Sequence, residues 1–143
     1  MIVLDANILL YAYNSDSPFY DKARKHLEAL LSNPEPVGIP IQCIYAFLRL
    51  LTNPIVSGRQ ISVKDATATV DEWLVQPHVS VLYPGERHWE ILKRLAVQGH
   101  ALGNLISDAA IAATAIEYGG VIHTNDRDFA RFPGVRWLNP IQP

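Results

Sequence analysis

Residues 1–7 read Met-Ile-Val-Leu-Asp-Ala-Asn. The three apolar residues after Met1 form a short run that is typical of a buried strand, and Asp5 ends this run. In open α/β sheets, ligands bind at the carboxyl ends of the strands. We therefore expect Asp5 to lie at the functional edge of such a sheet.

Short strand patterns alternate with longer helical patterns along the rest of the chain. Strands are expected at residues 2–4, 37–39, 79–82, 121–124 and 135–138. Helices are expected at residues 8–13, 18–32, 40–51, 66–75, 86–98 and 104–118, with Ser17-Pro18 beginning the second and Asn53-Pro54 ending the third. This alternation predicts a three-layer α/β/α fold with a mostly parallel five-stranded central sheet.

The composition excludes several classes of protein. With 143 residues and no internal repeat or linker, residues 1–143 are expected to form a single domain. Twelve Lys and Arg against 14 Asp and Glu give a net charge of −2, which excludes a strongly basic nucleic-acid-coating protein but allows a local basic patch. The single Cys43 excludes a disulfide framework and a cysteine-rich zinc site, and indicates the cytoplasm. No apolar run approaches the roughly 20 residues that span a bilayer, so no membrane association is expected.

Three further aspartates fall where the chain is expected to return to the same sheet edge. Asp126 follows the fourth expected strand, Asp128 comes two residues later, and Asp108 lies in the first turns of the last expected helix. Each has an ordinary structural explanation when it is taken alone. Asp5, Asp126 and Asp128 are in positions suited to helix caps, and a helix dipole favours a carboxylate at Asp108.

Several carboxylates at one sheet edge favour a cation, because two unit charges about 4 Å apart repel by about 4 kcal/mol at an effective dielectric near 20. Hard oxygen ligands without a cysteine or a paired histidine favour Mg²⁺ or Mn²⁺ over zinc. Such a site polarises a phosphodiester and activates a bound water. The pattern therefore indicates metal-assisted phosphoryl hydrolysis.

Three stretches resemble motifs of the PIN-domain ribonucleases, and above all those of the VapC-like toxins of bacterial toxin–antitoxin pairs. They are MIVLDANILLY (1–11), GNLISDA (103–109) and TNDRDFARFPG (124–134). The resemblance extends over essentially the whole chain in the expected order. It implies a PIN-like fold and an endoribonuclease that depends on Mg²⁺ or Mn²⁺, cleaves RNA and arrests translation.

The resemblance also implies partners and residue roles. Such toxins are homodimers as a rule, and a cognate small antitoxin protein neutralises them. By motif match, the catalytic and metal-binding residues are Asp5, Asp108 and Asp126, with auxiliary roles for Asp128, Asn7 and Thr124.

One position departs from the family pattern. The family carries a glutamate on the helix after the second strand, and the matching residue here is Ala46. At helical spacing, Gln42, Ala46, Arg49 and Asn53 share one stripe, so this wall of the site lacks a carboxylate. Our hypothesis is that three acids suffice for one Mg²⁺, with waters in its other coordination positions.

RNA binding requires cations near the acids, because phosphates supply most of the affinity. Arg49, Arg127 and Arg131 are the candidates, and the last two are spaced to share a helix face. A second hypothesis, motivated by Ala46, is a catalytically weakened PIN module that binds RNA or its antitoxin. A third, a phosphotransfer protein, is disfavoured because Asn7 replaces the second aspartate of a dehalogenase-like phosphatase and no lysine follows Lys93 for a receiver domain.

Overall fold

The computed structural model describes residues 1–143 and contains a five-stranded sheet in which every pairing is parallel. The strand order is β3-β2-β1-β4-β5. The strands are β1 (Ile2–Leu4), β2 (Val37–Pro40), β3 (Val79–Leu82), β4 (Val121–His123) and β5 (Trp137–Leu138). The helices are α1 (Ala6–Ala12), α2 (Tyr20–Ser32), α3 (Ile41–Leu51), α4 (Pro54–Ser57), α5 (Val63–Leu74), α6 (His88–Gln98), α7 (Leu105–Tyr118) and the 3₁₀ helix η1 (Arg127–Arg131).

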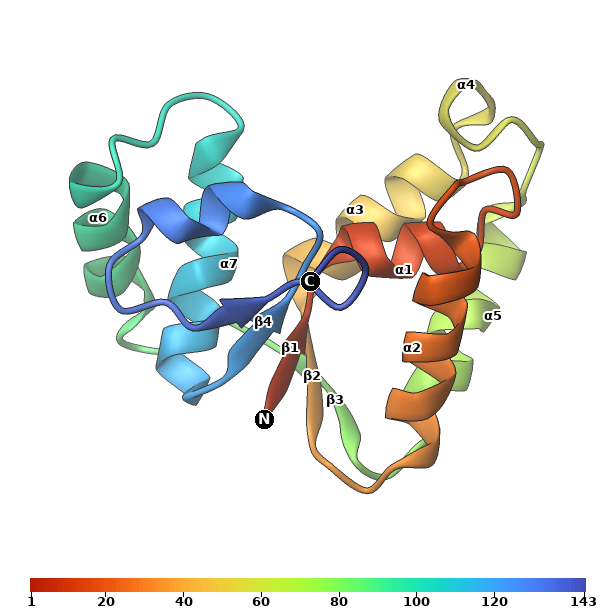
Figure 1. The fold of residues 1–143 in the computed structure, drawn as a ribbon, viewed down its shortest axis with the longest axis horizontal. Coiled ribbons are helices and arrows are strands. Elements are labelled where there is room, and N and C mark those ends of the chain that lie inside the picture. Colours follow the sequence, from red (N-terminus) through yellow and green to blue (C-terminus); the bar gives the residue numbers. More distant parts are fainter.

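Helices cover both faces of the sheet (Figure 1). Helices α6 and α7 lie on one side, and α1, α2 and α5 lie on the other, with α3 leading away from the end of β2. This arrangement confirms the predicted three-layer fold, and the sheet is wholly rather than mostly parallel. None of the helices is both long enough and apolar enough to cross a bilayer.

The strand order places a switch point beside β1. The chain adds β2 and β3 on one side of β1, and then β4 and β5 on the other. In β1 and β4, Ile2 pairs with Val121 and Leu4 pairs with His123, so both strands end at the same level of the sheet. Crevices at such switch points are where α/β sheets bind ligands.

The core explains why the strands are short apolar runs rather than alternating ones. Every residue of β1 and β2 is buried, because helices cover both faces of the sheet. A cluster of 33 buried hydrophobic residues joins the sheet to both helical layers. Its largest members include Trp73 and Phe47, whose rings lie 4.7 Å apart between α5 and α3.

Several helix boundaries differ from the sequence prediction by one to three residues. Helix α1 begins at Ala6 instead of Ile8, α5 at Val63 instead of Ala66, and α6 at His88 instead of Glu86. Helix α2 begins at Tyr20 instead of Pro18, because the Ser17 hydroxyl accepts a hydrogen bond from the Phe19 N–H in a local turn. Asn53-Pro54 ends α3 as predicted but also begins the short helix α4, since Asn53 Oδ1 accepts from the Ile55 N–H and proline suits the first helical position.

Gly38 on β2 leaves room for the Leu82 side chain of the neighbouring strand β3, and replacing it tests this packing. A methyl group at Gly38 would lie 2.5 Å from Leu82 Cδ1. We expect Gly38→Ala to lower the free energy of unfolding by about 1–3 kcal/mol in urea titrations. In a Leu82→Ala background, Gly38→Ala should cost less than it does in the wild type, because the shortened side chain leaves room for the methyl group; strictly additive costs would contradict the proposed overlap.

Candidate active site

The Thr124 hydroxyl joins the ends of the two central strands. Thr124 follows β4, is fully buried, and donates a hydrogen bond of 2.7 Å to Asp5 Oδ2 at the end of β1. The Thr124 hydroxyl oxygen in turn accepts from the Asp126 N–H at 3.0 Å and from Asn7 Nδ2 at 3.2 Å. Asn7 Oδ1 in turn accepts from the Asn125 N–H at 3.3 Å. This network fixes Asp5 and the loop after β4 relative to each other.

Asp5 lies on the floor of a cavity of about 390 Å³ and also caps a helix. Its Oδ1 accepts from the Ala6 N–H at 2.7 Å, which is an N-cap bond for α1. Only 7% of the residue is exposed, and burial raises the pKa of the carboxyl against the opposing effect of the Thr124 hydrogen bond. The capping role and the cavity-lining position thus belong to the same residue.

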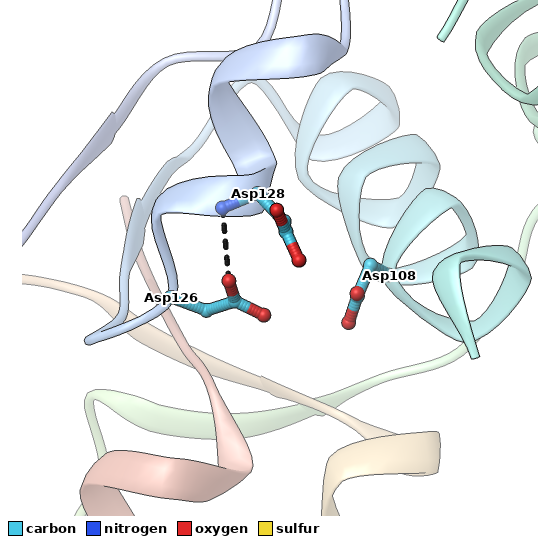
Figure 2. A group of neighbouring side chains, drawn as sticks. All are labelled: Asp108, Asp126 and Asp128. Atoms are coloured by element: carbon cyan, nitrogen blue, oxygen red, sulfur yellow. Dashed lines mark hydrogen bonds between the residues drawn. The ribbon is translucent and has the colours of Figure 1, made fainter. Parts of the chain in front are cut away.

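Asp108, Asp126 and Asp128 form the acid cluster above this floor. One oxygen of each lies within 4.8 Å of the others, and the three carboxylates face a common gap (Figure 2). Asp108 comes from the first turn of α7, whereas Asp126 and Asp128 come from the loop and 3₁₀ helix after β4. The Asp128 N–H donates to Asp126 Oδ1 at 2.8 Å, so the cap of η1 also orients the second carboxylate.

Within the acid cluster, the pKa of Asp108 is clearly shifted. Burial raises its pKa to about 6, and the neighbouring charges of Asp126, Asp5 and Asp128 add to this rise. One cation within the chain partly offsets this rise: Arg131, whose Nη2 lies 3.9 Å from Asp128 Oδ1, acts to lower the pKa of Asp108. Burial and the repulsion among the carboxylates nevertheless outweigh this cation, because the pKa of Asp108 stays above its ordinary value.

The donor set suits a hard divalent cation. The acid cluster offers carboxylate oxygens and includes no histidine or cysteine. His123, which ends β4, does not belong to this cluster. Its Nδ1 lies 2.9 Å from Nε2 of His26, and burial lowers the pKa of His123 to about 4. Oxygen ligands in this number and charge fit Mg²⁺ or Mn²⁺.

All three predicted catalytic acids line the same cavity, but their positions in it differ. Asp5, Asp108 and Asp126 all contribute to its wall. Asp5 has both carboxylate oxygens in hydrogen bonds, whereas Asp128, expected as an auxiliary residue, belongs to the tight acid cluster. The other two auxiliary residues, Asn7 and Thr124, connect Asp5 to the loop that carries Asp126.

Helix α3 forms the wall without a carboxylate. Gln42, Ala46 and Arg49 line the cavity, as expected from their shared stripe, but Asn53 caps α4 instead. Cys43 and Ser107 also line the cavity, and neither is among the residues predicted for the site. Cys43 Sγ lies 3.9 Å from Asp5 Oδ1, a contact that no spacing along the chain reveals, while Ser107 could have been found as the neighbour of Asp108.

The three candidate arginines are in different environments. Arg49 is exposed at the cavity and has no ion pair within the chain. Arg131 donates to the Gly99 carbonyl at 3.0 Å and lies near Asp128. Arg127 is exposed, and it does not share a face with Arg131, because η1 has the three-residue period of a 3₁₀ helix, which aligns Arg131 with Asp128.

Comparison with known proteins assigns this architecture to a family. The family model for the PIN domain matches residues 2–135. The chain belongs to the PIN domain family. Over 141 residues, this PIN domain is 39% identical to the VapC ribonuclease Mb2897 of Mycobacterium bovis, a match that covers 99% of this chain and 96% of that protein.

Solved structures of low sequence identity share the fold of this PIN domain. A chain from VapBC2 of Rickettsia felis, bound to a DNA fragment from its promoter, superposes with a TM-score of 0.72 at 21% identity and covers 97% of this chain and 98% of that chain. A chain from a toxin–antitoxin complex of Klebsiella pneumoniae superposes with a TM-score of 0.68 at 19% identity and covers 98% of each chain.

Removing the Thr124 hydroxyl tests its role in the PIN domain. Thr124→Val leaves Asp5 Oδ2 without its donor, and we expect the free energy of unfolding to fall by about 1–3 kcal/mol in urea titrations. The pKa of the Asp5 carboxyl, followed by NMR, should rise further in this variant, whereas Thr124→Ser should leave it near the wild-type value. An equal effect of both substitutions on that pKa would contradict the role of the hydroxyl.

Neutralising Asp108 tests the repulsion within the acid cluster. Because folding raises this pKa from 3.8 to about 6, the carboxyl favours the native state below pH 4, and this advantage is lost as pH rises through 6. In EDTA at pH 7.5, Asp108→Asn should therefore raise Tm by about 2–4 °C, a modest effect because the group is partly solvated. The difference from wild type should shrink toward pH 4.

The control for this experiment is Asp71→Asn, which removes an exposed carboxylate from α5. Its Tm should follow that of the wild type at every pH. Millimolar Mn²⁺ should reverse the order and make the wild type more stable than Asp108→Asn, since a bound ion stabilises the native state. If the Tm of Asp108→Asn differed from that of the wild type by the same amount at every pH, with and without Mn²⁺, the proposed repulsion among the acids would be contradicted.

Proposed function

We propose that the chain is the toxin of a toxin–antitoxin pair and a divalent-metal-dependent endoribonuclease that hydrolyses RNA phosphodiester bonds. The observation that carries this proposal is the acid cluster of Asp108, Asp126 and Asp128, within 4.8 Å, at the switch point of a PIN domain. The 39% identity to a protein named a VapC ribonuclease supports the same activity. Residues 1–143 act as a single domain in this proposal.

The proposed ligands of Mg²⁺ or Mn²⁺ are Asp108, Asp126 and Asp128, with Asp5 below them on the cavity floor. A bound ion at this position supplies Lewis acidity toward the phosphate and an activated water for hydrolysis. Free carboxylate oxygens support the assignment, because Asp108 accepts no hydrogen bond that would lower its pKa and Asp126 uses only Oδ1 in its cap.

The chain's own residues orient these acids. Thr124 holds Asp5 through one bond and the Asp126 backbone through another, so both acids keep a fixed spacing across the strand ends. Asn7 ties the same loop to α1 through Asn125. Such supporting hydrogen bonds are what align ligating carboxylates for a metal. Arg127 and Arg131, on η1 beside the cluster, add positive charge that attracts the RNA backbone.

The proposed partners are a cognate small antitoxin protein and a second copy of the chain in a homodimer. The fold shared with a chain from a toxin–antitoxin complex supports the first partner. An apolar groove of about 420 Å³, lined by residues of α1, α3 and α4, shares Leu10 and Leu50 with the acid cavity. A protein segment in this groove would therefore lie beside the acids. The proposed location is the cytoplasm, because a toxin of this kind would act on cellular RNA.

Ala46 favours one alternative, a PIN module that binds RNA or its antitoxin without efficient cleavage. The wall formed by α3 carries no acid at this position, which removes one negative charge from the site. A protein with a weaker metal site would still bind partners through the arginines and the groove, but it would cleave RNA more slowly. The two functions differ in whether RNA is cut or only bound.

The test is cleavage of a mixed cellular RNA pool by protein purified free of any partner, with Mn²⁺, Mg²⁺ or EDTA. We expect discrete cleavage with either metal, none in EDTA, and a loss on the order of 10²-fold or more in folded Asp108→Asn. Asp71→Asn should cleave like the wild type. Cleavage that persists in EDTA would contradict the metal dependence, and RNA binding without cleavage would favour the binding module.

A further inference from the structure

Arg49 is an unpaired cation at the entrance to the acid cavity. It lies on α3 three residues after Ala46, is exposed, and forms no ion pair within the chain. Besides the inner cavity of about 390 Å³, it lines an outer cleft of about 710 Å³. A free guanidinium in such a position is available to a ligand rather than to the fold.

The inner cavity and the outer cleft meet at four shared residues, which we call the neck. They are Arg49, Ser107, Asp108 and Asp126. Asp108 and Asp126 come from α7 and from the loop after β4, whereas Arg49 comes from α3. An RNA strand in the outer cleft would therefore place a phosphate between carboxylates that face a metal and a guanidinium.

The net charge around the neck indicates how many divalent cations the site requires. Four aspartates (Asp5, Asp108, Asp126 and Asp128) and Arg49 line the cavity or the cleft, and Arg131, outside both, lies 3.9 Å from Asp128. These six side chains together leave two negative charges. One divalent cation balances that charge. A second divalent ion would give the site a surplus of two positive charges, and the wall at Ala46 has no carboxylate to hold it.

We propose that Arg49 binds the scissile phosphate at the neck and that one divalent cation, rather than two, completes the site. This inference rests on the proposed ribonuclease function. In hydrolysis the water oxygen bonds to phosphorus and gives up its proton, while the bond from phosphorus to the leaving oxygen breaks and that oxygen takes up a proton. Negative charge grows on the non-bridging oxygens, and a guanidinium binds two such oxygens through parallel N–H donors.

The other two arginines do not offer the same contact. Arg131 donates to the Gly99 carbonyl and lies beside Asp128, so its guanidinium is already engaged. Arg127 lines neither the inner cavity nor the outer cleft. Arg49 is thus the cation whose position and free donors suit the reacting phosphate.

The test compares Arg49→Ala and Arg49→Lys with Lys64→Ala, which removes one positive charge from an exposed site on α5. Cleavage kinetics on one RNA are measured with calorimetric titration of Mn²⁺ alone. We expect one Mn²⁺ per chain. Arg49→Ala should lower kcat on the order of 10²-fold while binding Mn²⁺ at least as tightly as the wild type, because a neighbouring positive charge has been removed.

The conservative variant separates charge from geometry. Arg49→Lys should keep the wild-type affinity for Mn²⁺ and recover only part of the rate, since an ammonium lacks the paired donors. Lys64→Ala should match the wild type in both measurements. Circular dichroism and Tm of every variant establish that the compared proteins are folded.

The outcomes distinguish this inference from the function on which it rests. Two Mn²⁺ per chain would overturn the single-cation site, and weaker Mn²⁺ binding in Arg49→Ala or equal kcat in Arg49→Ala and Lys64→Ala would overturn the role of Arg49. Each of these results would leave the ribonuclease in place. A wild-type protein that cleaves no RNA with Mn²⁺ or Mg²⁺ would overturn the ribonuclease and this inference together.

Discussion

The hydrogen bond from the Thr124 hydroxyl to Asp5 is the contact on which the site depends. Parallel pairing of β1 with β4 brings the two residues to adjacent strand ends, and the buried hydroxyl then serves Asp5, Asn7 and the Asp126 backbone at once. A buried carboxylate without such donors would be costly in this position. The same bond therefore satisfies the fold and sets the spacing of two acids.

The cavity carries its negative charge on the aspartates and a positive charge on the wall formed by α3. Asp108 reaches the cluster from a helix on the other side of the switch point, and burial among like charges raises its pKa. Opposite it, α3 presents Ala46 and Arg49 instead of an acid. This combination lowers the demand for bound cations and provides a donor for phosphate, so a site with fewer carboxylates remains suited to phosphodiester chemistry.

The sequence predicts the features that depend on local pattern. Strand–helix alternation gives the layers, and an aspartate directly after an apolar run gives Asp5 its place at the sheet edge. The features that the sequence does not predict depend on contacts between distant residues or on the type of helix. Cys43 contacts Asp5 only when α3 packs against α1, and Arg131 shares a face with Asp128 rather than with Arg127 because η1 is a 3₁₀ helix.

The most direct test of the central claim is to locate the metal. A crystal of the protein grown with Mn²⁺ would reveal each bound ion by its anomalous scattering. We expect one anomalous peak, among the carboxylates of Asp108, Asp126 and Asp128, that is absent from Asp108→Asn crystals. A peak elsewhere on the molecule, or none at saturating Mn²⁺, would contradict the proposal that these acids form a metal-dependent catalytic site.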